Sequence, residues 1–102
     1  MDNTKAEAFA ARLQREMNAA MSCLTIQLGM RLGLTHALAE LGPSSATAVA
    51  QRAGCAERYA SEWLGAMAAG GYITYDPAGR TFELPREHAA VLLDPEHPSY
   101  AA

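Results

Sequence analysis

Large apolar residues recur every three or four positions along the first third of the chain, which is the spacing of one face of an α-helix. Charged and amide side chains take the opposite side up to Asn18. Thr4 and Glu7 have the spacing of a capping box, so the pattern predicts a helix from Thr4 to about Leu32. Its apolar face consists of Phe9, Leu13, Met17, Met21, Leu24 and Leu28.

The second half of this predicted helix is apolar on nearly every side and therefore needs cover all round. The run is too short for a membrane span and contains Gln27 and Arg31. The whole helix would be on the order of 40 Å long, whereas a compact domain of this size has a radius of gyration of about 13 Å. We expect one end to project. Its apolar face, the six residues named above, is predicted to be covered by a second copy in a two-fold dimer or by a second domain.

Shorter helices follow. Gly33 ends the first helix, and Thr35 is expected to cap a helix over 36–41, which Gly42 and Pro43 end. Ser44 or Ser45 caps a helix over 46–53, and Gly54 ends it. A further helix over 58–69 is predicted to stop at Gly70 and Gly71 in left-handed conformations. Its expected inner face is Tyr59, Ala60, Trp63, Leu64, Met67 and Ala68.

After these glycines the apolar period falls to two, which predicts strands over 72–75 and 81–84 joined by a turn at 76–79. A helical turn over 85–93 then docks through Val91 and Leu92. The predicted fold class is mainly α with a small β-hairpin: a winged helix-turn-helix (HTH) with a long N-terminal dimerisation helix. The expected parts are an interaction helix over 1–33, the winged HTH over 34–93 and a linker or tail over 94–102.

Composition adds little chemistry to this picture. The net charge of −3 gives no electrostatic reason to expect nucleic acid or an anionic membrane as a partner. Cys23 and Cys55 are predicted to be reduced and buried, and with no apolar signal segment at the N-terminus a cytoplasmic location is expected. The three histidines lack metal-ligand spacing. We therefore predict no catalytic, cofactor-binding or metal-binding residues, and no catalysis by this chain in isolation.

Several short segments together resemble a known family. They are Gly29 to Leu34; Arg58, Tyr59, Glu62, Trp63 and Leu64; Gly70, Gly71 and Tyr72; and Leu84, Pro85, Glu87, His88, Leu92, Leu93, Asp94 and Pro95. The pattern is similar to the N-terminal winged-helix, transcriptional-regulator-like domain of bacterial S-adenosylmethionine-dependent methyltransferases. This resemblance implies a homodimer and a lid over the acceptor substrate. It also implies a separate Rossmann-like domain, in cis or in trans, that binds S-adenosylmethionine.

The sequence has no strand followed by a Gly-x-Gly loop, so it lacks the means to hold that cofactor. We expect an isolated domain, half of a split enzyme, or a stand-alone auxiliary relative. Met17, Met21, Met30 and Met67 recur at helical spacing, which favours core positions. The alternative is an adaptable pocket that holds an apolar small molecule as a further partner. The alternative function is that of a DNA-binding transcriptional regulator. The scattered basic residues disfavour it, as does the segment 57–69, which sets Arg58 against Glu57 and Glu62.

Overall fold

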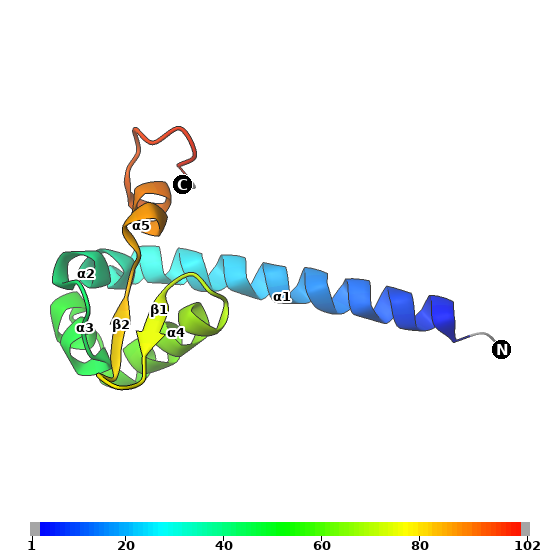
Figure 1. Cartoon of the computed structure of the whole chain (residues 1–102), viewed down its shortest axis with the longest axis horizontal. Coiled ribbons are helices and arrows are strands. Elements are labelled where there is room, and N and C mark those ends of the chain that lie inside the picture. The colour runs from blue at the N-terminus through cyan, green and yellow to red at the C-terminus, as the bar shows by residue number, and fades with distance from the viewer. Residues whose placement is uncertain (1–2, 101–102) are drawn as a thin grey trace.

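The computed structural model describes residues 3–100 and consists of a small helical body from which one long helix projects (Figure 1). The body and the projecting helix together measure 55 × 33 × 23 Å, and the radius of gyration is 16.1 Å. A compact domain of this length would have a radius of about 13 Å. The expected overhang is therefore confirmed. The elements are α1 (Thr4–Leu32), α2 (Leu34–Leu41), α3 (Ala46–Ala53), α4 (Glu57–Ala69), β1 (Thr74–Asp76), β2 (Thr81–Glu83) and α5 (Arg86–Leu93).

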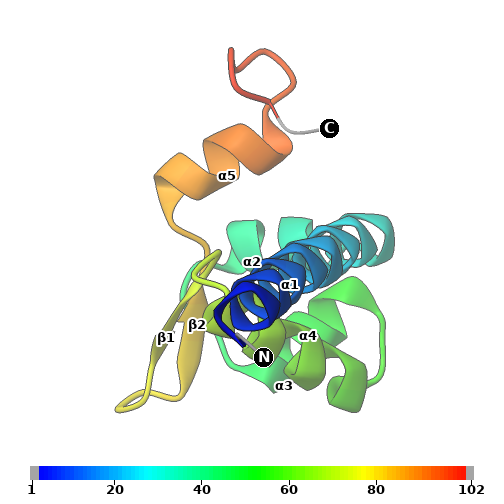
Figure 2. The same ribbon diagram turned by 90° about the vertical axis from the view of Figure 1, so that its right-hand side faces the viewer.

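The core lies where α2, α3 and α4 meet the C-terminal end of α1 (Figure 2). Leu34 and Leu38 of α2, Val49 of α3 and Leu64 of α4 are fully buried, and Met67 is nearly so. Burial of each such side chain contributes roughly 1.5–3 kcal/mol. These contacts fix the HTH pair α3 and α4, and they confirm the predicted winged HTH fold class.

The hairpin packs against the body as a wing. Strands β1 and β2 pair antiparallel, with Tyr75 opposite Phe82. Ser44 extends this ladder: its amide donates to the Phe82 carbonyl at 3.0 Å, and the Phe82 amide donates to the Ser44 carbonyl at 2.8 Å. The wing is thereby tied to the segment before α3. Arg80 closes the hairpin turn at φ 52°, a left-handed conformation that is uncommon for a residue with a side chain.

The predicted helix ends are partly right. Gly33 ends α1 at φ 77°, and the Ser45 hydroxyl accepts a hydrogen bond from the Ala48 amide at 3.2 Å. The predicted Thr4 cap is wrong, because Thr4 is already helical and Asn3 holds the cap position. The Thr35 cap is also wrong. Helix α2 starts directly after Gly33, since that start buries Leu34 completely, and Thr35 is buried in its first turn.

Three further expectations need correction. Tyr59 is 66% exposed, because the end of α1 does not cover the first turn of α4. Gly71 is left-handed, at φ 79°, but Gly70 keeps a right-handed helical conformation as the C-terminal cap of α4. Both cysteines are free as predicted, yet Cys23 is exposed and Cys55 is only half-buried. Cys23 lies on α1 where the body does not reach.

Within residues 3–100, no helix combines the length and the apolar character needed to cross a membrane. Met1, Asp2, Ala101 and Ala102 belong to the predicted interaction helix and tail segments. These four residues lie outside the part of the chain that the structure describes.

Candidate interaction surface

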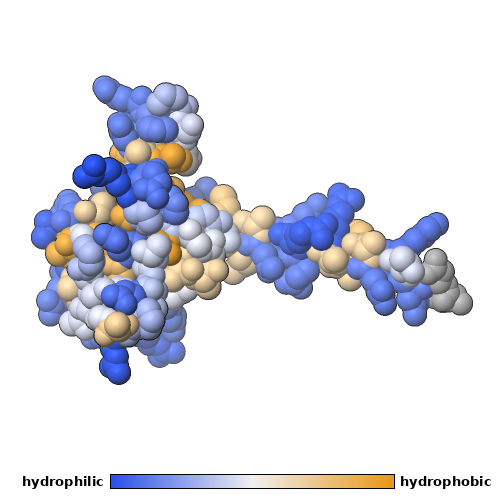
Figure 3. Space-filling model, in the orientation of Figure 1, coloured by the Kyte–Doolittle hydropathy of each residue, from blue (hydrophilic) through white to orange (hydrophobic). Residues whose placement is uncertain are grey.

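The most prominent surface feature is a row of large apolar side chains along α1. Their exposed fractions run from 43% at Leu13 to 62% at Met21. Figure 3 shows apolar patches along the projecting helix, between polar ones. We call this set the apolar row: Phe9, Leu13, Met17, Met21, Leu24, Leu28 and Leu32. The structure thus places all six predicted interface residues on the surface and adds Leu32, which continues the row by one helical turn.

Residues 4–21 of α1 project beyond the body and are exposed on every side. From Leu24 to Leu32 the row is exposed because α1 contacts the body through a different side. The indole Nε1 of Trp63 donates a hydrogen bond to the Thr25 carbonyl at 2.9 Å. The same indole lies directly on Gly29, where a Cβ atom would overlap the ring. Ile26 packs against the core beside this contact. With Thr25, Ile26 and Gly29 turned inward, one side of α1 is left open along its length (Figure 2).

A groove of about 210 Å³ lies between α1 and α4 and is continuous with the apolar row. Leu28 and Leu32 form its α1 side, and Tyr59 and Trp63 form much of its α4 side. The exposed ring of Tyr59 therefore enlarges the apolar surface at the C-terminal end of the row. This position of Tyr59 could not be predicted from the sequence, because a helical period does not show which residues a neighbouring helix covers.

A second cleft, of about 440 Å³ and mostly apolar, opens between α1, the end of α4 and α5. His88 places an imidazole in the wall of this cleft, and its Nδ1 lies 2.7 Å from the Tyr72 carbonyl oxygen. Because a carbonyl only accepts, Nδ1 donates in this contact, and Nε2 is the acceptor of the neutral tautomer with this arrangement. The lining residues are Ile26, Gly70, Gly71, Tyr72, Glu87, His88, Val91 and Leu92.

The methionines do not form the single pocket that the sequence suggested. Met67 is 1% exposed and belongs to the core, whereas Met17 and Met21 are more than half exposed on α1. Their helical spacing reflects two separate surfaces.

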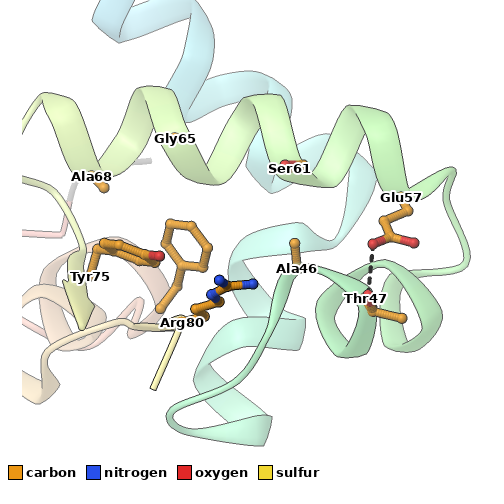
Figure 4. Close-up of a pocket in the computed structure, with 9 residues that line it drawn as sticks. Ala46, Thr47, Glu57, Ser61, Gly65, Ala68, Tyr75 and Arg80 are labelled. Carbon is orange, nitrogen blue, oxygen red and sulfur yellow. Dashed lines mark hydrogen bonds between the residues drawn. The ribbon is translucent and has the colours of Figure 1, made fainter. Parts of the chain in front are cut away.

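The cleft between α4 and the wing is the most polar of these hollows, with a volume of about 670 Å³ (Figure 4). The Arg80 side chain extends into it from the wing, which also lines the cleft with Tyr75 and Phe82. At its far end the Thr47 hydroxyl donates to the Glu57 carboxylate at 2.7 Å. No nucleophile, base and orienting group come together here among the described residues.

The exposed face of α4 is poorly suited to phosphate. Arg58 pairs with Glu62, as predicted, with 3.4 Å between Nε and Oε1. Glu57, which is also exposed, adds negative charge at the start of the helix. DNA-binding proteins usually rely on several unpaired cations on one face. This face of the HTH therefore lacks the electrostatic pattern of a DNA reader.

The described residues can be tested for two kinds of site, a metal-ligand cluster and a glycine-rich cofactor loop. Residues 3–100 contain no group of three or more His, Cys, Asp or Glu side chains that could hold a metal ion. The two strands form an antiparallel hairpin, and Gly70–Gly71 follows a helix. Binding of S-adenosylmethionine on a Rossmann-like fold uses a glycine-rich turn between a parallel strand and a helix. The described segment does not fit this cofactor.

Comparison with known proteins agrees with the geometry. The chain is similar in structure to mitomycin 7-O-methyltransferase MmcR, with a TM-score of 0.78 and 24% identity over 97% of this chain and 29% of that chain. It is similar to PigF, solved with SAH, with a TM-score of 0.72 and 24% identity over 87% of this chain and 28% of that chain. This chain thus spans less than a third of either protein. No match was found among curated proteins.

A family model matches most of the chain. The model of Rv2258c-like winged HTH domains matches residues 19–93. The match begins inside α1 and continues through α5, so it includes the C-terminal half of the apolar row and the whole body. The chain belongs to the family of Rv2258c-like winged helix-turn-helix domains.

Proposed function

We propose that this chain is the dimerisation and substrate-lid module of an S-adenosylmethionine-dependent methyltransferase-like protein. In this proposal residues 1–33 are the interaction segment, residues 34–93 the winged HTH body and residues 94–102 a linker. The methyl donor is bound by a separate catalytic domain. The observation that carries the proposal is the apolar row on α1, with exposed fractions between 43% and 62%.

Covering the open side of α1 would stabilise the protein. Complete burial of a large apolar side chain stabilises by roughly 1.5–3 kcal/mol. The row offers seven such side chains that are about half exposed, and its polar flanks keep the rest of the helix soluble. A second copy presents the same surface, so one contact buries two rows at once. Self-association is therefore the simplest way to cover this face.

The self-association proposal predicts a dimer in solution. Sedimentation equilibrium of the full chain at tens of micromolar should give about twice the chain mass of 10.9 kDa. The dissociation constant should depend little on salt, because the row itself carries no charge. A mass equal to one chain across this concentration range would contradict the dimerisation function.

The lid function is supported by the apolar cleft beside α5. Its walls come from α1, α5 and the segment 70–72 that follows α4, and Val91 and Leu92 give it an apolar side. His88 supplies an imidazole held in place by the Tyr72 carbonyl. Such a site suits a flat apolar molecule with a hydroxyl that donates to Nε2.

The lid proposal predicts weak binding of a polycyclic phenol to the chain alone. We expect 1,8-dihydroxyanthraquinone to bind with a dissociation constant in the range of roughly 10 μM to 1 mM, typical of half of a composite site. Leu92→Gln should weaken binding about tenfold, because it places an amide in the apolar wall. Ser61→Gln, in the cleft between α4 and the wing, is the control. Equal binding by both variants and the unaltered chain, monitored by chemical shifts of His88 and Val91, would contradict this site.

A further inference from the structure

The spacing of the apolar row reads almost the same in both directions along α1. The steps from Phe9 to Leu32 are four, four, four, three, four and four residues. An antiparallel copy can therefore place Phe9 opposite Leu32, Leu13 opposite Leu28 and Met17 opposite Leu24. Met21 then lies next to the two-fold axis and faces its own copy. An isologous contact requires this kind of self-complementary surface.

The row also winds obliquely around α1. Its steps are mostly longer than the 3.6 residues of one helical turn, so the row turns by roughly 140° between Phe9 and Leu32. At its C-terminal end it reaches the side of α1 that borders the α1–α4 groove, where Leu32 and Tyr59 both line the hollow. Two such rows can overlay only if the helices cross at an angle. The crossing carries the N-terminal end of each helix toward α4 of the other copy.

We propose that two copies associate through antiparallel, obliquely crossed α1 helices, with Phe9 of each copy seated in the α1–α4 groove of the other, against Leu32 and Tyr59. This inference rests on the proposed dimerisation function and adds its register. It gives a role to the ring of Tyr59, which one copy leaves 66% exposed. It also closes the groove, whose volume of about 210 Å³ is large enough for an aromatic ring.

The available area suits a stable dimer. A half-exposed Leu, Met or Phe presents on the order of 100 Å², so the row and Tyr59 together bury roughly 700–800 Å² per copy, which is the size of a standard interface. The ends of two crossed helices diverge, so without the groove the outermost residues of the row would stay exposed to solvent. Helix α4 fills that gap because it stands beside the C-terminal end of α1, where the Trp63 indole fixes it.

Disulfide trapping tests the register. In a Cys23→Ser, Cys55→Ala background, Met21→Cys should form a disulfide with its own copy under mild oxidation. Leu13→Cys alone should not, but a mixture of Leu13→Cys and Leu28→Cys should give at least about tenfold more linked dimer, because the bond requires Cα atoms about 4.4–6.8 Å apart. Linked Leu13→Cys homodimers would instead indicate parallel helices. That result would overturn the register while leaving dimerisation intact, whereas a monomeric background protein would contradict both.

The seat of Phe9 is tested by affinity. Phe9→Ala and Tyr59→Ala should each raise the dissociation constant of the dimer roughly tenfold. The double variant should raise it by less than the product of the two single effects, because the two rings contact each other. Tyr75→Ala removes another exposed tyrosine, on the wing, and should leave the affinity unchanged. If Phe9→Ala weakens the dimer but Tyr59→Ala does not, Phe9 lies outside the groove and the proposed seat is wrong.

Discussion

Replacing Leu24 by aspartate is expected to weaken self-association by roughly 100-fold or more, so that the protein becomes monomeric at tens of micromolar. Leu24 lies near the middle of the apolar row and is 60% exposed, so the body does not depend on it. The substitution enters the two-fold contact twice. It removes two buried side chains worth roughly 1.5–3 kcal/mol each and puts two carboxylates in their place. Sedimentation velocity over a concentration series measures the change.

Ala19→Asp is the matched control. Ala19 is exposed on the same helix but points away from the row, so the same charge is added with no loss of apolar contact. We expect its dimer affinity to stay within about threefold of the unaltered chain. Circular dichroism should show that both variants keep the helical content of the parent. Equal affinities for Leu24→Asp and Ala19→Asp would show that some other face holds the copies together.

The overhang of α1 followed from the sequence because it depends only on length and composition. A helix of this length cannot fit inside a body built from the remaining residues, whatever their arrangement. The hairpin of the wing could also be predicted, since Gly71 and a later turn bracket a change of period from helix to strand. Its bounds differ: β1 occupies Thr74–Asp76 rather than 72–75, and β2 ends at Glu83 rather than at residue 84. Both features depend on residues that are close together in the sequence, so the sequence pattern was sufficient to predict them.

The corrections at Tyr59 and Thr35 concern packing rather than local pattern. The residues around Tyr59 in the sequence do not show whether α1 covers its ring. Thr35 looked like a cap because its hydroxyl suits one, but complete burial of Leu34 starts the helix earlier. The α1–α4 groove joins residues about 30 positions apart in the sequence, such as Leu28 and Tyr59. Candidate residues on one helix could be predicted, whereas the surface they share with α4 could not.

The contact between Trp63 and Gly29 holds the long helix to the body, and the structure shows why both residues are needed. Trp63 is 4% exposed, and its Nε1 satisfies the Thr25 carbonyl at 2.9 Å. Gly29 is the buried residue of α1, and the missing side chain lets the indole lie on the helix backbone. Glycine costs a helix interior about 1 kcal/mol relative to alanine. This cost is offset by the burial of the indole.

Trp63→Ala is therefore expected to lower the free energy of unfolding by about 3–5 kcal/mol, because it leaves a large cavity between α1 and α4. Gly29→Ala should destabilise by roughly 1–3 kcal/mol through overpacking against the indole. Gly65→Ala is its control. Gly65 is interior to α4 with open space around it, so alanine should stabilise there by up to about 1 kcal/mol. Urea denaturation followed by circular dichroism, in the Leu24→Asp background to remove the contribution of dimerisation, measures all three. Stabilisation by Gly29→Ala equal to that by Gly65→Ala would show that α1 does not pack closely on Trp63 in solution.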